Sequence, residues 1–258
     1  MTDRTEAAAA HLARLRLRDG IAPPIDDLPS DLRPRDLAEA YAVQIALRRR
    51  LAPRLGPVTG WKIGCTSKVM QDYLGVDHPC MGTLFAGQLH RGEATLRAAD
   101  YRKLGLECEI AVRMARDVAP GEDAATAVGG VMCSVEIVEE RFADFSSCAK
   151  ESLVADDFFS MGCVLGPEHA LADLPDLKTL RGGFRVNGDE VATGLGAAIY
   201  GDPLDALRWL AETRAPEGGL KAGEVATLGS VVKTIYPQAG DSVDARFETL
   251  GAITVDIV

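Results

Sequence analysis

The stretch Leu104-Gly-Leu-Glu-Cys-Glu-Ile-Ala-Val-Arg-Met114 guides the interpretation of the whole chain. Successive side chains of a β-strand point to opposite faces, so period-two alternation gathers the large apolar side chains of this stretch on one face. Glu107 and Glu109 then share the other face, with their Cβ atoms about 7 Å apart. We expect a strand whose apolar face enters a core. Its other face is either solvated or offers two oxygen ligands to a divalent cation.

A second apolar run, Val131–Val138, contains a single carboxylate, Glu136. A strand buried on both faces tolerates a charge only if the charge is paired or bound to metal, because isolated burial is costly. One interpretation places Glu136 at a strand end, paired with an arginine such as Arg141. The other brings Glu136 to Glu107 and Glu109. Three carboxylates with water suit Mg²⁺ or Mn²⁺ rather than zinc, which prefers histidine or cysteine.

A third alternating segment is Gly60-Trp-Lys-Ile-Gly-Cys65. Its apolar side chains share one face, which leaves Lys62 between Gly60 and Gly64 on the other face. Glycines beside a lone lysine leave room for the close approach of a ligand backbone or carboxylate. The alternative interpretation is an ordinary lysine on an edge strand.

Helix signals lie in the first 51 residues and in two internal segments. Apolar spacing and helix propensity predict helices over residues 7–19, stopped by Gly20, and over residues 37–51, before Pro53. Thr66-Ser67 can cap a short helix that ends at Gly75, and Asp202-Pro203 opens another.

Strand signals dominate from Val58 onward. Asn187-Gly188 predicts a type I′ hairpin, and alternating residues 243–247 and 253–257 predict a terminal strand pair. No internal repeat or linker interrupts the pattern. We therefore expect one α+β domain over residues 1–258, with an N-terminal helical arm (1–56) and a β-rich body (57–258).

Composition narrows the function classes. The chain has 258 residues, 47% of them hydrophobic, with 28 Lys and Arg against 38 Asp and Glu, for a formal charge of −10. This balance lacks the basic field that nucleic-acid binding requires, and no segment is apolar enough to span a membrane. Six cysteines occur with no C-x-x-C pair. We expect a cytoplasmic protein with reduced thiols.

Several motifs, in a fixed order, resemble the 2-keto-4-pentenoate hydratase and 4-oxalocrotonate decarboxylase branch of the fumarylacetoacetate hydrolase superfamily. The resemblance spans nearly the whole chain. The segments that carry it are Gly60–Ser67, Leu74–Pro79, Gly82–Phe85, Glu107–Ala111, Val135–Val138, Val154–Asp156, Val164–Gly166, Gly196–Ala198, Leu220–Gly223, Gly229-Ser230 and Gly240–Val243.

The resemblance implies a mixed β-sheet roll with flanking helices, a homo-oligomer, and a set of functional residues. Glu107, Glu109 and Glu136 would hold Mg²⁺ or Mn²⁺, which would bind the carboxylate and 2-oxo group of a small 2-keto acid. Lys62 would be the catalytic residue, supplying a cation or a proton-transfer group near the substrate's oxygens. The other substrate-binding candidates are Ser160, Ser230 and Asp77.

The activity implied by this resemblance is hydration. A 2-hydroxy-2,4-dienoate of the 2-keto-4-pentenoate type would take up water to give a 4-hydroxy-2-oxo acid, a reaction of aromatic-compound catabolism, with the metal as Lewis acid. The nearest alternative is decarboxylation of a 2-oxo-hex-3-enedioate of the 4-oxalocrotonate type. Hydrolytic carbon–carbon cleavage of an acylpyruvate ranks third. A non-catalytic partner subunit is the alternative from another class.

Two segments depart from the family pattern. The chain has Cys80 and Met81 where family members commonly have an aspartate and an aromatic residue, so a thiol replaces the acid proposed to handle protons or water. Asp157, Phe158 and Phe159 stand where many hydratases have Asn, Ala and Ser. This change predicts a bulkier, more apolar wall. The residues that could take over proton handling are Asp77, His78 and Asp157.

Overall fold

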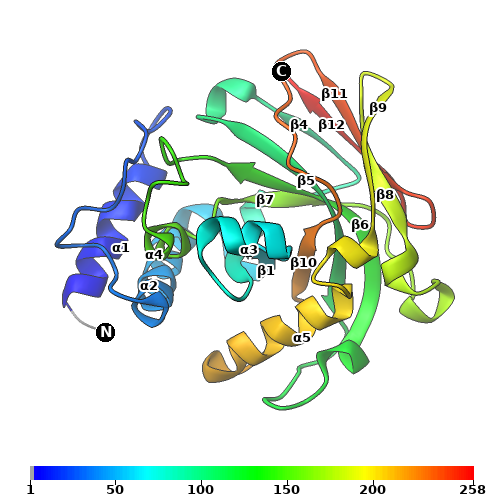
Figure 1. Cartoon of the computed structure of the whole chain (residues 1–258), viewed down its shortest axis with the longest axis horizontal. Coiled ribbons are helices and arrows are strands. Elements are labelled where there is room, and N and C mark those ends of the chain that lie inside the picture. The colour runs from blue at the N-terminus through cyan, green and yellow to red at the C-terminus, as the bar shows by residue number, and fades with distance from the viewer. Residues whose placement is uncertain (1–2) are drawn as a thin grey trace.

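The computed structural model describes residues 3–258, which form five α-helices and twelve β-strands (Figure 1). The helices are α1 (Asp3–Arg16), α2 (Leu37–Leu55), α3 (Lys68–Leu74), α4 (Lys150–Ala155) and α5 (Pro203–Arg214). The strands are β1 (Val58–Gly64), β2 (Cys80–Phe85), β3 (Leu89–Arg91), β4 (Glu93–Leu96), β5 (Leu104–Met114), β6 (Val128–Glu139), β7 (Ser160–Leu165), β8 (Arg181–Val186), β9 (Asp189–Leu195), β10 (Val225–Ser230), β11 (Ser242–Phe247) and β12 (Gly251–Ile257).

The strands form two mixed sheets. The larger has the order β2-β1-β10-β5-β6-β7-β3, and the smaller has the order β4-β12-β11-β8-β9. The larger sheet curls on itself, so that β2 at one edge meets β7, which is next to the other edge. The Ser160 hydroxyl on β7 donates to the Thr83 carbonyl on β2 at 2.8 Å. The predicted mixed β roll with flanking helices is confirmed.

The apolar face of β5 lies between the two sheets, as its alternation predicts. Leu106, Cys108 and Ile110 are fully buried in one core cluster with Phe184 of β8 and Val243 of β11. Full burial of a large apolar side chain contributes about 1.5–3 kcal/mol. This core fixes β5, and with it the opposite face of the strand, against the interior of the roll.

The N-terminal helices pack on one side of the roll, where α1, α2 and α4 lie together (Figure 1). They share a second core cluster that includes Leu12, Leu47 and Phe158. The buried side chain of Gln44 in α2 donates to the Met81 carbonyl at 2.8 Å and the Val154 carbonyl at 3.0 Å. Helix α2 is therefore attached to strand β2 and to helix α4, and α1 packs on α2.

The two N-terminal helices differ from the predicted boundaries. The first begins at Asp3 and ends at Arg16, because the alanine-rich start favours the helix and an acidic residue suits its first turn. The second continues through Pro53 to Leu55. Proline in this last turn removes only its own N–H bond, and the N–H of Gly56 still closes the turn on Ala52 at 2.9 Å.

The other predicted elements are confirmed. Ser67 caps α3, and Gly75 ends it in the left-handed conformation. Asn187 and Gly188, with φ of 53° and 93°, connect β8 to β9. Asp202 caps α5, while β11 and β12 form the terminal antiparallel pair. The short helix α4 was not predicted, because six residues carry too little periodicity to show a pattern.

Candidate active site

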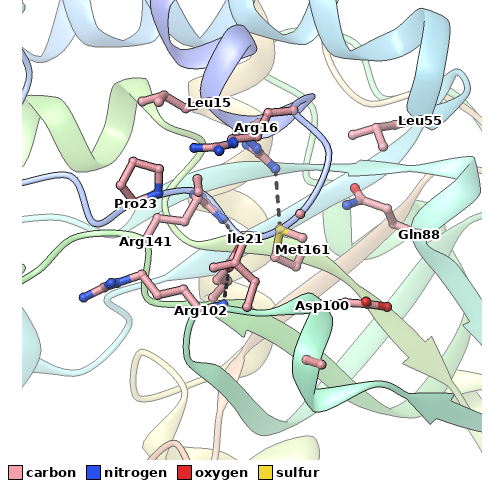
Figure 2. A pocket seen from close by; sticks show the side chains of 15 residues that line it. Leu15, Arg16, Ile21, Pro23, Leu55, Gln88, Asp100, Arg102, Arg141 and Met161 are labelled. Atoms are coloured by element: carbon pink, nitrogen blue, oxygen red, sulfur yellow. Dashed lines mark hydrogen bonds and ion pairs between the residues drawn. The ribbon is translucent and has the colours of Figure 1, made fainter.

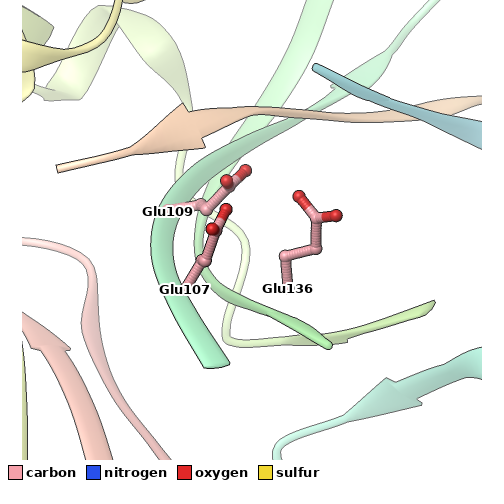
Figure 3. Close-up of side chains that lie close together, drawn as sticks. All are labelled: Glu107, Glu109 and Glu136. Atoms are coloured by element: carbon pink, nitrogen blue, oxygen red, sulfur yellow. The ribbon is translucent and has the colours of Figure 1, made fainter. Parts of the chain in front are cut away.

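Strand register brings the predicted metal ligands together inside the roll. Glu107 of β5 lies opposite Glu136 of β6, and directly opposed residues share one face of a sheet. Glu107, Glu109 and Glu136 each offer a carboxylate oxygen within 4.8 Å of the others (Figure 3). Glu109 and Glu136 are fully buried and Glu107 is half-buried. The solvated-face interpretation of β5 is therefore wrong.

Lys62 supplies the cation that Glu136 requires. Its Nζ lies 2.9 Å from Glu136 Oε1, and both side chains are buried. The predicted alternative, an ion pair of Glu136 with Arg141, is wrong, because Arg141 bonds Asp156 at 2.5 Å. The edge-strand interpretation of Lys62 is also wrong, since β1 lies between β2 and β10.

Neighbouring groups hold two of the carboxylates in place. The Gly229 N–H donates to Glu109 Oε2 at 3.0 Å, and the Thr234 hydroxyl donates to Glu107 Oε1 at 2.5 Å. Gly229 has a φ of +119°, and a Cβ there would lie 2.5 Å from Thr66 Oγ1, so this position requires glycine. Both bonds come from the end of β10 and the segment after it.

The remaining oxygens of the cluster fit a hard cation. Glu109 Oε1 and both oxygens of Glu136 are buried without a hydrogen-bond donor, apart from the Lys62 ion pair. Buried carboxylate oxygens left in this state are costly, whereas convergent oxygen donors are the ligands that Mg²⁺ and Mn²⁺ prefer. The residues present therefore suit such an ion.

The electrostatics agree with this assignment. Burial, reinforced by Glu136 and Glu107, raises the pKa of Glu109 well above its ordinary value. Burial also raises the pKa of Glu136 to about 7, although the attraction of Lys62 opposes the shift. Burial alone would lower the pKa of Lys62, but the three carboxylates outweigh it and the pKa is raised. Lys62 is thus an ammonium ion at neutral pH.

The space beside Lys62 is filled by the protein itself. A Cβ at Gly64 would lie 2.6 Å from Cε1 of Phe158, and one at Gly60 would lie 2.0 Å from the Val225 carbonyl oxygen. The prediction that Gly60 and Gly64 leave room for a ligand is therefore wrong at these two positions. A ring from the α4–β7 connection and a neighbouring strand occupy the space.

One further glycine shapes the lysine's surroundings. Gly82 of β2 pairs with Lys62, and a Cβ there would lie 3.0 Å from Lys62 Cε. Lys62 also pairs with Thr227 of β10, whose buried hydroxyl has no hydrogen-bond partner among the described residues. Sequence reasoning missed Thr227 because its segment shows no local signal. Gly82 was visible only within a family motif.

The predicted substrate-binding residues occupy different places. Ser230 is half-buried opposite Glu109, and its hydroxyl donates to the Cys108 carbonyl at 3.2 Å. Ser160 is buried, with its hydroxyl committed to the link between β7 and β2. Asp77 lies after α3 with a side chain 97% exposed, 3.9 Å from the ring of His78. The structure does not include Asp77 in the carboxylate cluster.

Cys80 and Asp157, which mark the two departures from the family pattern, are both buried. Burial raises the pKa of the Cys80 thiol to about 12, so this thiol stays protonated at neutral pH. Asp157 is buried and accepts a hydrogen bond from the Thr83 N–H at 2.9 Å, with Arg16 3.5 Å away. Its carboxylate therefore links the α4–β7 connection to β2 and to the end of α1.

A cavity of about 270 Å³ lies where the end of α1 meets β7 (Figure 2). Arg16 and Arg141 line it, and Arg16 donates to the Ser160 carbonyl at 3.0 Å. Both guanidinium groups are neutralised nearby, by Asp157 and Asp156 respectively. The cavity shares no lining residue with the carboxylate cluster, and its arginines support the segment that leads into β7.

Fold and site together define a β-roll protein with a largely buried carboxylate cluster that suits a divalent cation, and an adjacent lysine. The chain belongs to the fumarylacetoacetate hydrolase family, because residues 77–258 match the family model described as Fumarylacetoacetate (FAA) hydrolase C-terminal. The predicted resemblance is confirmed.

Two curated relatives and one solved structure are similar over nearly the full length. The chain is 32% identical to a 2-keto-4-pentenoate hydratase of Paraburkholderia xenovorans (strain LB400), covering 98% of this chain and 94% of the relative. It is 30% identical to a 4-oxalocrotonate decarboxylase of Pseudomonas putida, covering 98% and 96%. The structure of 4-oxalocrotonate decarboxylase from Pseudomonas putida G7, complexed with magnesium and adipate, superposes with a TM-score of 0.90 at 26% identity, covering 100% and 99%. No helix among residues 3–258 has the length and apolar character to cross a membrane.

Proposed function

We propose that this chain is a metal-dependent hydro-lyase that adds water to a 2-hydroxy-2,4-dienoate and forms a 4-hydroxy-2-oxo acid in aromatic-compound catabolism. The observation that carries the proposal is the convergence of Glu107, Glu109 and Glu136 beside the Lys62 ammonium. The similarity to a 2-keto-4-pentenoate hydratase over nearly the whole chain supports it.

Each residue of the cluster has a distinct role in this proposal. Glu107, Glu109 and Glu136 would hold Mg²⁺ or Mn²⁺, which when bound acts as a Lewis acid toward the 2-oxygen of the substrate. Glu136 fixes the Lys62 ammonium through their 2.9 Å ion pair. Because Lys62 Nζ carries a proton at neutral pH, it can donate a hydrogen bond or a proton to the bound acid. Lys62 is therefore the proposed catalytic residue.

Three hydroxyl or carboxyl groups complete the proposed substrate site. Ser230 is supported by its position opposite Glu109, at the edge of the cluster. Ser160 would act from the start of β7, where its hydroxyl already bonds Thr83. Asp77 enters the proposal through the family resemblance alone.

Decarboxylation of a 2-oxo-hex-3-enedioate is the second candidate. The fold similarity to 4-oxalocrotonate decarboxylase favours it, and both reactions would use the same metal centre and Lys62. The phenyl ring of Phe158 beside Lys62 favours hydration instead. A second carboxylate at that ring would lose its hydration shell, and Lys62, the cation beside the ring, is already paired with Glu136.

The two remaining alternatives have less support. Carbon–carbon hydrolysis of an acylpyruvate through a His-Glu pair would need a histidine at the metal centre, and the cluster within residues 3–258 consists of carboxylates. His78, one of four histidines, stacks on Trp209 instead. A non-catalytic partner subunit would bind metal without turnover. We further propose that the chain forms a single domain (1–258), assembles as a homo-oligomer and acts in the cytoplasm.

The deciding experiment follows the ultraviolet absorbance of freshly generated 2-hydroxypenta-2,4-dienoate with the purified protein. Mg²⁺-dependent decay to 4-hydroxy-2-oxopentanoate, abolished by a chelator, is the expected result. Release of CO₂ from 2-oxo-hex-3-enedioate, with no decay of the pentadienoate, would transfer the assignment to decarboxylation. No turnover in either assay, with Mn²⁺ still bound, would favour the non-catalytic subunit. Restored turnover in Cys80→Asp would then identify the lost acid as the cause.

A further inference from the structure

One aromatic ring lies beside the Lys62 ammonium. The centroid of the Phe158 ring lies 4.9 Å from Lys62 Nζ. The same ring packs directly on the bare backbone of Gly64, where a methyl group would lie 2.6 Å from it. Phe158 is only 5% exposed. The Lys62 ammonium therefore has Glu136 as one neighbour and an apolar ring as another.

The backbone fixes the position of this ring. Asp157, Phe158 and Phe159 all have left-handed φ, at 65°, 44° and 66°. Residues with side chains rarely adopt this region, and three in succession persist only where surrounding contacts enforce them. Those contacts are present, because the Phe158 N–H bonds the Leu153 carbonyl at 2.9 Å and Asp157 bonds the Thr83 N–H. The ring is thus a fixed wall of the site.

Other aromatic rings support Phe158 from outside. Phe159 meets it edge to face at 5.3 Å between ring centroids, and Phe145 meets Phe159 at 5.6 Å. Tyr73 of α3 meets Phe145 at 6.0 Å, which extends the row to the surface. Phe159 is the ring of this row that contacts Phe158 directly, so it is the one that resists displacement of Phe158.

We propose that Phe158 determines which 2-oxo acids fit, by admitting short apolar tails and excluding longer or acid-ended ones. The inference rests on the proposed function, because it assumes that the carboxylate cluster holds the head of the acid through a divalent cation. A tail that extends from that head past Lys62 meets the Phe158 ring. The ring limits the length of the tail, and it offers no charge to a terminal carboxylate.

The test measures binding, so that it does not depend on turnover. The Mn²⁺-loaded protein is titrated calorimetrically with pyruvate, 2-oxopentanoate, 2-oxooctanoate and 2-oxoadipate. The wild-type protein is expected to bind 2-oxopentanoate at least tenfold more tightly than either longer acid. Phe158→Ala is expected to reduce the preference over 2-oxooctanoate to less than threefold, and Phe158→Leu is expected to give an intermediate ratio.

Phe145→Ala is the matched control, because it removes a ring of the same row that is two rings away from Phe158. It should leave the length preference unchanged, and Mn²⁺ affinity should be equal in all variants. The inference would be overturned if the ratio of affinities for 2-oxopentanoate and 2-oxooctanoate were equal in wild type, Phe158→Leu and Phe158→Ala. Failure of every 2-oxo acid to bind would also overturn it. If Phe158→Ala does not fold, the Phe158→Leu ratio decides.

The two hypotheses fail in different ways. If length preference depends on Phe158 but no dienoate is hydrated, the proposed reaction is rejected and the role of Phe158 stands. If the dienoate is hydrated and the ratios do not respond to Phe158, the reaction stands and this inference is rejected.

Discussion

Removal of the Lys62 ammonium should destabilise the metal-free protein strongly. Lys62→Met keeps most of the apolar stem but leaves Glu136 fully buried beside two other carboxylates, with its 2.9 Å ion pair gone. Breaking a buried pair by removing one partner costs about 3–5 kcal/mol. We expect about 3 kcal/mol, at the lower end of that range, because Glu136 can take up a proton in place of its partner.

The sign of the pH dependence follows from Glu136. Its pKa is about 7 in the folded protein against an ordinary value of 4.5, so its charged form opposes folding. The folded protein binds this proton more readily than the unfolded chain does, so stability rises as pH falls through about 7. In Lys62→Met the attraction that lowers the pKa of Glu136 is absent, so this pKa rises further. The pH range over which stability depends on this proton then extends to higher pH. The cost of the substitution should therefore be larger at pH 8.5 than at pH 6.

Urea unfolding with a chelator present, at both pH values, measures this difference. The control is Lys68→Met, which removes an exposed α3 lysine paired with Asp72 at 2.7 Å, with a side chain 73% exposed. A surface pair of this kind contributes about 0–1 kcal/mol. If Lys62→Met and Lys68→Met unfold at the same urea concentration at pH 8.5, the buried pair does not stabilise the fold and the reasoning fails.

Three further predictions concern the same site. Glu109→Gln should weaken Mn²⁺ binding at least tenfold and abolish Mg²⁺-dependent turnover without a change in circular dichroism; retained turnover would remove the metal centre from the mechanism. Gly64→Ala should lower the free energy of unfolding by about 1–3 kcal/mol through overpacking against the ring of Phe158. In urea unfolding, adding Gly64→Ala to Phe158→Ala should lower the stability much less than it does in the wild type. Additive losses of the two substitutions would contradict the contact. Because burial raises the pKa values of Cys80 and Cys163 well above 9, neither thiol should react with iodoacetamide at pH 8 before unfolding, as peptide mass mapping can verify.

Local patterns predicted the part of the fold that local physics determines. The period-two alternation of Leu104–Met114 reflects a strand with one buried face, and the strand has these bounds in the structure. Capping residues such as Ser67 and Asp202 act within one turn, so they locate helix starts correctly. Pro53 misled the prediction because its effect depends on how close it lies to the helix end.

The partners within the site could not be predicted in the same way. Glu136 of β6 pairs with Lys62 of β1, 74 positions away in the sequence, because the sheet order is β1-β10-β5-β6 and the sheet curls. Nothing in either segment encodes that strand order. The sequence offered Arg141 as the nearer partner, but Arg141 faces Asp156. The Phe158 ring was predicted as a bulky wall, and only the fold places it on Gly64.

The charge of the cluster dictates the order in which ligands bind. Three carboxylates and one ammonium leave two negative charges when all are ionised, in an interior where like charges interact strongly. Without a divalent cation the carboxylates are either charged or hold protons, as the raised pKa values of Glu109 and Glu136 indicate, so the three carboxylates offer no group that would attract the negative charge of a 2-oxo acid. We therefore expect no calorimetric signal from 2-oxopentanoate in the presence of a chelator, and binding once Mn²⁺ is added. Binding of equal strength without metal would show that Lys62 alone recognises the acid. The carboxylates would then serve to orient Lys62 instead of holding a cation.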